Sequence, residues 1–360
     1  MKKVLIIRGS ALGDVVKFLP VASALKNNFD EEFEIHWLVT KKFKTVLEGN
    51  RFIDKILVFE DYKDLWFRIA KRIFRRKDSL VGLNKWLKFS KANKLQKENY
   101  DIVINLHEKF DAAMFAEACS APKLAKAPWL PGSDVVSKED KNVILKGLET
   151  LKSLDKKFDV DDFVNKNIDY GWNFGAEELE RTESLLKNNG LDSDRFIIFV
   201  LSTTWESKNY PVKNWIKLTQ LAVENNKAVV FMGDAKDKEA LKKIKASVNG
   251  SQLVDLIGKT SLRQMIMVLN KADVVVGGDT GPLHIAASLN VPTITLMNST
   301  SPEVHGTLGK KGIMLTADYP CKNCYKVVCP KGECCMQYIA PEKVFETILR
   351  CAELESVSNN

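Results

Sequence analysis

The sequence has no long apolar run and few histidines. Among 360 residues no stretch approaches the roughly 18 consecutive apolar residues that cross a bilayer, and the apolar run after Lys3 is interrupted at Arg8, too early for a signal peptide. Only four histidines are present, and no Ser, His and Asp stand in a recognisable triad context. These absences argue against a membrane bundle and a serine hydrolase, and we expect a cytoplasmic protein.

Two common phosphate-binding motifs are also missing. Gly258-Lys259-Thr260 resembles the end of a P-loop, but Leu253 stands where the first glycine of that motif is needed. After the first apolar run the loop has glycines at 9 and 13 only, so the third glycine of the dinucleotide fingerprint is absent. The acidic pair Asp159 and Asp161 follows no strand-like run and does not suggest a metal-holding motif. The sequence therefore disfavours P-loop NTPases and nicotinamide-dependent enzymes.

Short apolar runs alternate with segments of helical length, a pattern typical of parallel sheets covered on both faces. In the first half these runs are Val4–Ile7, Ile35–Val39, Ile56–Phe59 and Ile102–Leu106. In the second half they are Phe196–Leu201, Ala228–Met232, Leu253–Ile257, Val274–Val276 and Thr293–Leu296. The length suits two domains, so we predict an α/β protein with two Rossmann-like parallel-sheet domains. We place them at residues 1–170 and 171–345, followed by a helix end and tail at 346–360.

Positive charge is concentrated in one segment, residues 63–97, which holds twelve Lys or Arg residues in a chain of net charge +8. An acidic partner is implied, and nucleic acid, an anionic membrane surface or a phosphorylated acceptor would each satisfy it. On a helix, one face would carry the apolar residues Leu65, Trp66, Ile69, Ile73 and Phe74. The basic residues Arg68, Lys71, Arg72, Arg75 and Arg76 would fall largely on the other.

This division is typical of a helix at a membrane interface, and Trp86, Leu87 and Phe89 with their neighbouring lysines extend it. The alternative is a helical hairpin that packs on the first domain and exposes its basic face to solvent. The sequence does not choose between the two.

Ligands of parallel sheets gather beyond the carboxyl ends of the strands, so the loops after the apolar runs are the candidate sites. The first loop, Arg8–Asp14, has two glycines that allow a sharp turn, and it brings a carboxylate to the strand end. Asp14 then leads a helical run, where Asp is a favoured N-cap. The other interpretation of Asp14 is a general base that faces the ligand.

A second candidate loop, Ser202–Tyr210, follows a buried run and ends at Pro211, a residue suited to the first turn of a helix. Thr203, Thr204 and Lys208 supply hydroxyl donors and one positive charge, a composition suited to a diphosphate. The alternative is a solvated surface loop.

The third loop is the most specific. Val274–Val276 leads into Gly277-Gly278-Asp279-Thr280-Gly281-Pro282 and then into a helical run that contains His284. A glycine-rich loop that opens a helix binds anions, because unpaired backbone N–H groups and the helix dipole point at the ligand. His284 is either a ligand contact or a structural histidine that holds the loop.

Five of the seven cysteines lie between Cys321 and Cys335. The candidate zinc ligands among them are Cys321, Cys324, Cys329 and Cys334. Their spacing is compatible with tetrahedral zinc, but the four-residue gaps and the absence of histidine fit the usual zinc motifs poorly. Reduced thiols in a compact C-terminal loop are the favoured interpretation for a cytosolic protein, ahead of a zinc site or disulfides.

Together these elements resemble the bacterial heptosyltransferases of glycosyltransferase family 9. The resemblance covers nearly the whole chain and is carried by Arg8–Asp14, Thr203-Thr204 with Lys208, Gly258–Leu262, Asp279–His284 and the cysteine-rich stretch before Met336. It implies the two-domain fold called GT-B, with the donor nucleotide held mainly by the second domain and the acceptor at the first. It also implies ADP-heptose as the donor and a lipid-linked saccharide of the lipopolysaccharide core as the acceptor.

The resemblance further implies roles for individual residues. Asp14 would be the general base, and the acceptor side would include Arg8, Ser10, Gly13 and His107. The donor would be bound by Thr203, Thr204, Lys208, Asp237, Asp279, Thr280, Gly281 and His284. Two positions depart from the family pattern, because Asp237 stands where a ribose-binding Glu is common and Glu108 where glycine is frequent.

The reaction implied is an inverting transfer that requires no cofactor or metal, carried out in the cytoplasm and peripherally at the inner face of the inner membrane. Two other functions fit parts of the sequence. The diphosphate loops do not distinguish sugars, so a transferase for another nucleotide sugar fits the same residues. A nucleic-acid-binding protein would use residues 63–97, but its strand-end loops would have no reason to gather hydroxyls with Lys208 and Asp279. Nucleic acid is therefore the less favoured partner.

Overall fold

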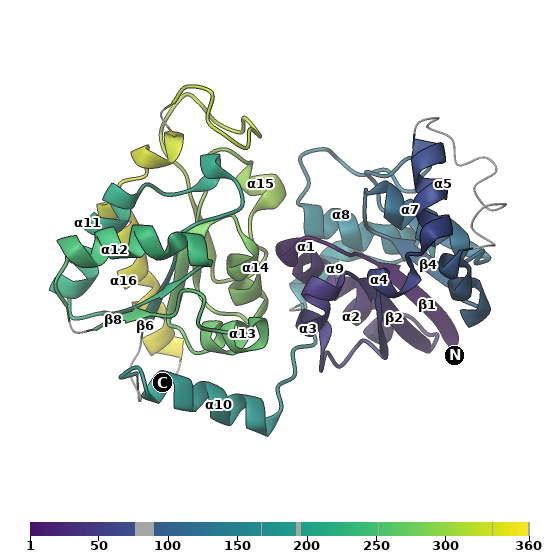
Figure 1. Ribbon diagram of the computed structural model, residues 1–360, viewed down its shortest axis with the longest axis horizontal. Helices are drawn as coiled ribbons and strands as arrows, with labels where there is room; N and C mark the ends of the chain where they lie inside the picture. Colours follow the sequence, from purple (N-terminus) through teal and green to yellow (C-terminus); the bar gives the residue numbers. More distant parts are fainter. Residues whose placement is uncertain (76–89, 167, 192–195, 251, 333, 359–360) are drawn as a thin grey trace. The chain divides into compact units, whose positions relative to one another are not determined.

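The computed structural model describes residues 1–75, 90–166, 168–191, 196–250, 252–332 and 334–358. The chain forms two compact units, Met1–Asn173 and Phe174–Asn360, each built on its own parallel sheet (Figure 1). The predicted α/β class with two parallel-sheet domains is confirmed. The units divide after Asn173, where the sequence suggested residue 170, and residues 346–360 belong to the second unit instead of forming a segment of their own.

The first unit has a five-stranded sheet in the order β3-β2-β1-β4-β5. Its strands are β1 (Lys2–Ile7), β2 (Phe33–Val39), β3 (Lys55–Val58), β4 (Ile102–Asn105) and β5 (Lys123–Lys126). Its described helices are α1 (Leu12–Lys17), α2 (Leu19–Asn27), α3 (Lys44–Leu47), α4 (Phe59–Tyr62), α5 (Leu65–Arg75), α7 (Phe110–Ala118), α8 (Val143–Glu149) and α9 (Val160–Asn165). The α9 helix is capped by Asp159, whose carboxylate accepts the N–H groups of Asp161 and Asp162 at 2.9 and 3.1 Å.

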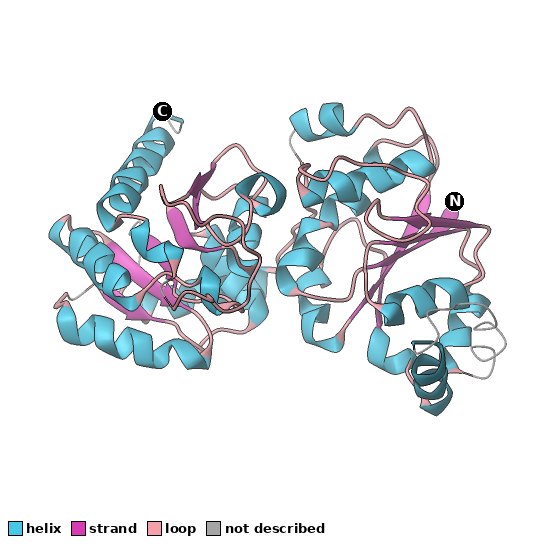
Figure 2. Cartoon of the chain, turned by 90° about the horizontal axis from the view of Figure 1, so that it is seen from above, coloured by secondary structure: helices cyan, strands magenta, loops and turns pink. Residues whose placement is uncertain are grey.

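The second unit has a six-stranded sheet in the order β11-β10-β9-β6-β7-β8. Its strands are β6 (Phe196–Val200), β7 (Ala228–Met232), β8 (Leu253–Asp255), β9 (Val274–Gly278), β10 (Thr293–Leu296) and β11 (Gly312–Leu315). Its described helices are α10 (Ala176–Lys187), α11 (Val212–Glu224), α12 (Lys238–Ser247), α13 (Leu262–Asn270), α14 (Gly281–Ser288), α15 (Pro302–His305) and α16 (Pro341–Ser358). In both units the strands are flanked by helices (Figure 2).

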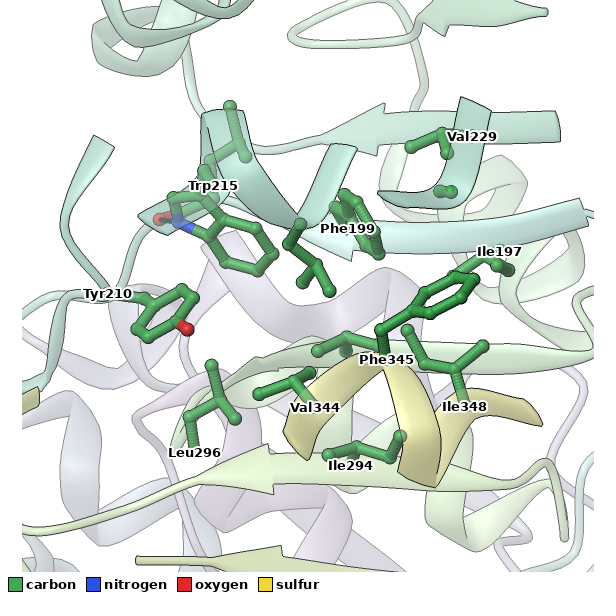
Figure 3. Packing of buried hydrophobic residues seen from close by; sticks show 14 of the residues in the cluster. Ile197, Phe199, Tyr210, Trp215, Val229, Ile294, Leu296, Val344, Phe345 and Ile348 are labelled. Carbon is green, nitrogen blue, oxygen red and sulfur yellow. Dashed lines mark hydrogen bonds between the residues drawn. The ribbon is translucent and has the colours of Figure 1, made fainter. Parts of the chain in front are cut away.

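The packing of the second unit explains why the sequence of β6 is an unbroken apolar run. All five residues of β6 are buried, because helices cover both faces of the sheet. Figure 3 shows Phe199 of β6 near Trp215 of α11, with ring centroids 5.2 Å apart, and Phe345 and Ile348 of α16 in the same cluster. Burying a side chain of this size contributes about 2 kcal/mol. The C-terminal helix is therefore part of the core.

Each sheet has one topological switch point. The chain begins in the middle of the sheet at β1 or β6, adds strands toward one edge, and then returns to the other side at β4 or β9. In the first sheet the loops after β1 and β4 therefore turn away from each other at the carboxyl edge, and in the second sheet the loops after β6 and β9 do the same. Each pair of loops leaves a crevice between them, and ligands of such sheets bind there. The predicted acceptor-side residues follow β1 and β4, and the predicted donor-binding residues other than Asp237 follow β6 and β9.

Helix α5 divides its apolar residues differently from the prediction. Phe67 and Ala70 face the core of the first unit, and Phe67 stacks on Phe115 with ring centroids 4.8 Å apart. Leu65 and Trp66 remain 67% and 44% exposed. The predicted segment continues through 76–89, which lie outside the described residues and include Arg76, Trp86, Leu87 and Phe89. No helix in the described part of the chain is long and apolar enough to span a membrane.

Candidate functional site

The first cluster of candidate residues is organised by Arg8, the residue that follows β1. Its guanidinium is only 5% exposed, and it forms an ion pair with Asp14. It also donates to the Leu106 carbonyl oxygen at 2.6 Å and to the Glu108 carboxylate at 3.0 Å. Arg8 therefore ties the loop after β1 to the loop after β4, and its contacts are with the protein's own acids.

Asp14 does not lead its helix as predicted. Helix α1 begins at Leu12 with Ala11 as N-cap, so Asp14 is the third helical residue, and its carboxylate accepts the Ala11 N–H at 3.4 Å. Its side chain is 36% exposed, and the Lys17 ammonium lies 4.0 Å from it. Burial raises the pKa of Asp14, but the opposing charges of Arg8 and Lys17 and the hydrogen bond from Arg8 outweigh it, so the pKa is lower than usual. Asp14 is an ionised, accessible carboxylate at neutral pH.

His107 and Ser10 face each other across the same pair of loops. The Gly9 N–H donates to His107 Nδ1 at 3.4 Å, which leaves Nε2 as the protonated nitrogen, 3.4 Å from the Ser10 hydroxyl. Burial, followed by the charge of Arg8, lowers the pKa of His107 to about 4, so its ring is neutral at pH 7. Lys109 donates to Ser10 at 3.3 Å and brings a further positive charge to this cluster.

The two glycines of the first loop have different roles. A side chain at Gly9 would collide with the ring of Phe59, so glycine is needed there for close packing. Gly13 lies inside α1, and the prediction that it forms part of the sharp turn is therefore wrong. Of the predicted acceptor-side residues, Arg8, Ser10 and His107 do come together around Asp14.

In the second unit, the loop after β6 is held in shape by its own polar groups. The Thr203 N–H donates to Asn209 Oδ1 at 2.7 Å, and the Thr203 hydroxyl donates to the Trp205 carbonyl oxygen at 2.8 Å while accepting the Trp205 N–H at 3.1 Å. Thr203 is 4% exposed, whereas Thr204 is exposed. Thr204 is thus the better placed of the two threonines to donate its hydroxyl to a ligand.

Lys208 and Asp279 form an ion pair that joins this loop to the one after β9. The Lys208 ammonium lies 2.6 Å from Asp279 Oδ2 and 4.4 Å from the centre of the Trp205 ring, a cation–π contact. Asp279 Oδ1 lies 3.1 Å from His284 Nε2. Asp279 Oδ2 also accepts a hydrogen bond from the Thr300 hydroxyl at 3.2 Å. Asp279 and His284 are buried, so this network fixes where the Lys208 ammonium sits.

The loop after β9 matches the anion-binding pattern of the sequence. Thr280 is the N-cap of α14, and Gly281 is its first residue. A Cβ on Gly278 would lie 2.6 Å from the Lys208 carbonyl oxygen and 2.7 Å from Thr203 Cγ2, so glycine is required for the two loops to approach. The Lys208 ammonium, the Thr204 hydroxyl and the start of α14 thus belong to neighbouring loops at one sheet edge.

Asp237 lies in a different environment from the one predicted for a ribose ligand. It is 5% exposed, and its carboxylate accepts the Asp234 N–H at 2.8 Å in the short turn η5 (Ala235–Asp237). This carboxylate stabilises the turn that leads into α12. The shorter reach of Asp compared with Glu is consistent with this inward position.

The cysteine-rich segment lies over the carboxyl edge of the second sheet. The Ser207 N–H donates to the Val327 carbonyl oxygen at 3.0 Å, and the Cys334 thiol donates to the Ser207 carbonyl oxygen at 3.2 Å. In the described part of the chain the seven cysteines form no disulfide. Among the described side chains no three His, Cys, Asp or Glu residues gather as ligands for one metal ion, so the four predicted zinc ligands do not converge.

Several charged or polar groups of these clusters were not predicted from the sequence. Lys17, Lys109 and Thr300 all come within 4.0 Å of a predicted residue. The only sequence signal for Lys17 is its helical spacing of three from Asp14. Lys109 and Thr300 lie in the loops that follow β4 and β10. Their position in strand-end loops is the sequence signal for them.

The chain is similar to known proteins over most of its length. The sequence model for Glycosyltransferase family 9 (heptosyltransferase) matches residues 88–334. Lipopolysaccharide heptosyltransferase 1 of Pseudomonas aeruginosa is 24% identical over 355 residues, with 91% of this chain and 87% of that protein covered.

Among solved structures, E. coli ADP-heptose LPS heptosyltransferase II has a TM-score of 0.74 at 20% identity and covers 99% of this chain and 100% of its own. E. coli heptosyltransferase WaaC with ADP has a TM-score of 0.70 at 20% identity and covers 97% and 100%. These likenesses confirm the predicted GT-B fold. Because the family model matches more than half of this chain, the chain belongs to glycosyltransferase family 9, the heptosyltransferases.

Proposed function

We propose that the protein transfers a heptose from ADP-heptose to a lipid-linked saccharide of the lipopolysaccharide core, with inversion at the anomeric carbon. The observation that carries the proposal is the pair of switch-point clusters, an accessible ionised carboxylate in one unit and a fixed ammonium beside a helix N-terminus in the other. Two solved relatives, E. coli ADP-heptose LPS heptosyltransferase II and heptosyltransferase WaaC with ADP, support the choice of donor.

On the acceptor side, Asp14 is the proposed general base. It accepts the proton of the acceptor hydroxyl as that oxygen attacks the anomeric carbon, and the bond from this carbon to the diphosphate oxygen breaks in the same displacement. A single displacement inverts the anomeric configuration. Arg8 keeps Asp14 ionised and fixes its orientation, and Ser10 and neutral His107 offer hydrogen bonds to neighbouring hydroxyls of the acceptor.

On the donor side, the departing ADP takes the electron pair of the broken bond, and its diphosphate gains negative charge. We propose that the Lys208 ammonium, the Thr204 hydroxyl and the N-terminal end of α14 stabilise this charge. Asp279 and His284 act through Lys208 by holding its side chain in place. This assignment requires no metal ion and no cofactor.

The first prediction is that purified protein forms a heptosylated product from ADP-heptose and a heptose-free core acceptor, and that EDTA leaves the initial rate within about twofold. Positive groups of the protein balance the leaving charge, so a chelator removes nothing that the reaction uses. Mass spectrometry of the glycolipid gives the product, and ADP release gives the rate.

The same assay with ADP-glucose, UDP-glucose and GDP-mannose tests the other candidate, a transferase for a different nucleotide sugar. Faster transfer from any of these donors would replace the heptose assignment. A rate that collapses with EDTA and returns with Mg²⁺ or Mn²⁺ would contradict the metal-independent mechanism.

We also propose that the exposed side of α5 contacts an anionic membrane, where a lipid-linked acceptor lies. Leu65 and Trp66 are exposed at the start of this helix, and Arg68 and Arg72 are exposed beside them. Lys71, in contrast, pairs with Asp111 at 2.6 Å and is turned toward the protein. An apolar tip next to exposed arginines is the composition of an interfacial helix.

The second prediction is that the double variant Arg68→Glu/Arg72→Glu binds vesicles of phosphatidylethanolamine and phosphatidylglycerol at least about tenfold more weakly. Each basic residue near such a surface contributes about 1 kcal/mol, and reversal of its charge adds repulsion. Vesicle co-sedimentation measures this effect. Lys41→Glu/Lys42→Glu carries the same charge change on exposed residues of the same unit and serves as the control. Equal losses in the two variants would mean that only net charge matters, and that α5 is not the contact surface.

A further inference from the structure

The donor site as assigned above has less free positive charge than its ligand requires. A nucleoside diphosphate carries several negative charges, and departure of the sugar adds to them. The Lys208 ammonium is only 14% exposed and already lies 2.6 Å from the Asp279 carboxylate, which balances its charge. A second cation near the loop after β6 would therefore be expected.

Lys236 occupies such a position. It lies in η5 at the end of β7, the strand that pairs with β6 on the side opposite β9. Its ammonium donates to the carbonyl oxygen of Thr203 at 2.8 Å, directly before Thr204 in the diphosphate loop. Lys236 is exposed, and in the described part of the chain no carboxylate lies within ion-pair distance of it. Its charge is thus available to a ligand.

The turn that carries Lys236 is fixed by its neighbours. Asp237 directs its carboxylate inward onto the Asp234 N–H, and a side chain at Gly233 would collide with that carboxylate. With Asp237 buried, Lys236 is the residue of this turn whose charged group reaches the diphosphate loop. The inward carboxylate of Asp237 and the exposed lysine beside it belong to one local arrangement.

We propose that Lys236 is a donor-binding residue that contacts the diphosphate of the nucleotide sugar and supplies the second positive charge of the site. The inference rests on the proposed function, because it takes the loop after β6 as the place where the diphosphate binds. Two of the three donor hydrogens of an ammonium remain when one is used on the Thr203 carbonyl oxygen, so Lys236 can hold the loop and a phosphate oxygen together. Charge-assisted hydrogen bonds of this kind are among the stronger polar contacts.

The test compares ADP and adenosine binding by calorimetry to the full chain and to Lys236→Met, Lys236→Arg and Lys238→Met. Met is an unbranched side chain one atom shorter than Lys and removes the charge, whereas Arg keeps the charge. Lys238 is also exposed, lies two residues further along, and provides a variant of equal net charge. We expect Lys236→Met to raise the Kd of ADP about tenfold and to leave the Kd of adenosine within about twofold. The Arg variant and Lys238→Met should bind ADP within about threefold of the parent.

Each contrary result has a separate meaning. If the parent binds ADP and Lys236→Met binds it equally well, the inference is wrong and the proposed function stands. If Lys236→Met weakens ADP and adenosine to the same extent, Lys236 only supports the loop through Thr203, and the inference is again wrong. If the parent does not bind ADP, the proposed donor fails and the inference fails with it.

Discussion

Asp14→Asn is expected to reduce turnover by about 100-fold or more while donor binding persists. Asn is nearly the same size as Asp and can still accept the Ala11 N–H at the start of α1, but it cannot take the proton of an acceptor hydroxyl. A positioned general base contributes about 100-fold to 10,000-fold to a rate. The variant loses the ion pair with Arg8, yet Arg8 keeps the Leu106 carbonyl oxygen and Glu108, so the loss of stability should stay near 1–2 kcal/mol.

Glu108→Gln is the matched control for this variant. Glu108 is the other carboxylate bound to Arg8, and its removal also changes the charge around the guanidinium by one. A loss of less than about tenfold in Glu108→Gln, beside the large loss in Asp14→Asn, would separate proton transfer from general electrostatics. Single-turnover transfer and melting curves with and without ADP provide the two readouts. Near-parental turnover of the Asn variant would mean that Asp14 only stabilises α1.

The pH dependence of kcat/KM gives an independent readout of Asp14. A base acts in its ionised form, so its contribution is lost as the pH falls through its pKa. The pKa of Asp14 is lower than the ordinary value of an aspartate because the charges of Arg8 and Lys17 outweigh the effect of burial. The acid limb due to Asp14 should therefore lie at lower pH than the limb of an unperturbed aspartate. The charges of Arg8 and Lys17 keep Asp14 ionised at neutral pH, but they also lower its basicity. A weaker base favours transfer of the acceptor proton late in the displacement.

The location of the two clusters could be predicted from the sequence, but their internal contacts could not. Apolar runs followed by glycines and polar residues identify strand ends, and parallel sheets place ligands there. Arg8 and Glu108, however, are 100 residues apart, and only the adjacent pairing of β1 and β4 brings them together. The resemblance places Arg8 on the acceptor side, and the structure shows it buried and in contact with Asp14, Glu108 and the Leu106 carbonyl oxygen.

The other differences have local physical causes. The edge strands β5 and β11 are four residues each and were not predicted, because β5 has lysines at both ends and the apolar part of β11 is only three residues long. For α5 the sequence predicts the helical periodicity but not which face of the helix is buried. That face is set by the packing of Phe67 and Ala70 on α7, a helix about 45 residues later in the chain. For Asp237, the inward direction of the carboxylate depends on the backbone of η5, which residue identity alone does not determine.

Lys208→Met is expected to lower kcat by about 100-fold to 1,000-fold, because removal of one group that stabilises developing negative charge typically has this effect. The variant should also lose stability, since the buried Asp279 carboxylate would lose its ammonium partner, although His284 and Thr300 would still contact it. Leaving one buried charge of a pair uncompensated costs about 3–5 kcal/mol in other proteins. A loss of activity in this variant alone is therefore ambiguous, because it could reflect the disturbed network or the missing charge.

The double variant Lys208→Met/Asp279→Asn separates these two causes. It removes both charges of the pair, and Asn can still accept a hydrogen bond from the Thr300 hydroxyl, so we expect its melting temperature to recover most of the loss seen in Lys208→Met. Its turnover should stay as low as in the single variant, because the cation that faces the diphosphate is still missing. Thermal unfolding and single-turnover transfer on the same preparations measure the two effects. If activity returned together with stability, Lys208 would be needed only to balance Asp279, and the leaving-group charge would have to be stabilised by Thr204, Lys236 and the N-terminus of α14.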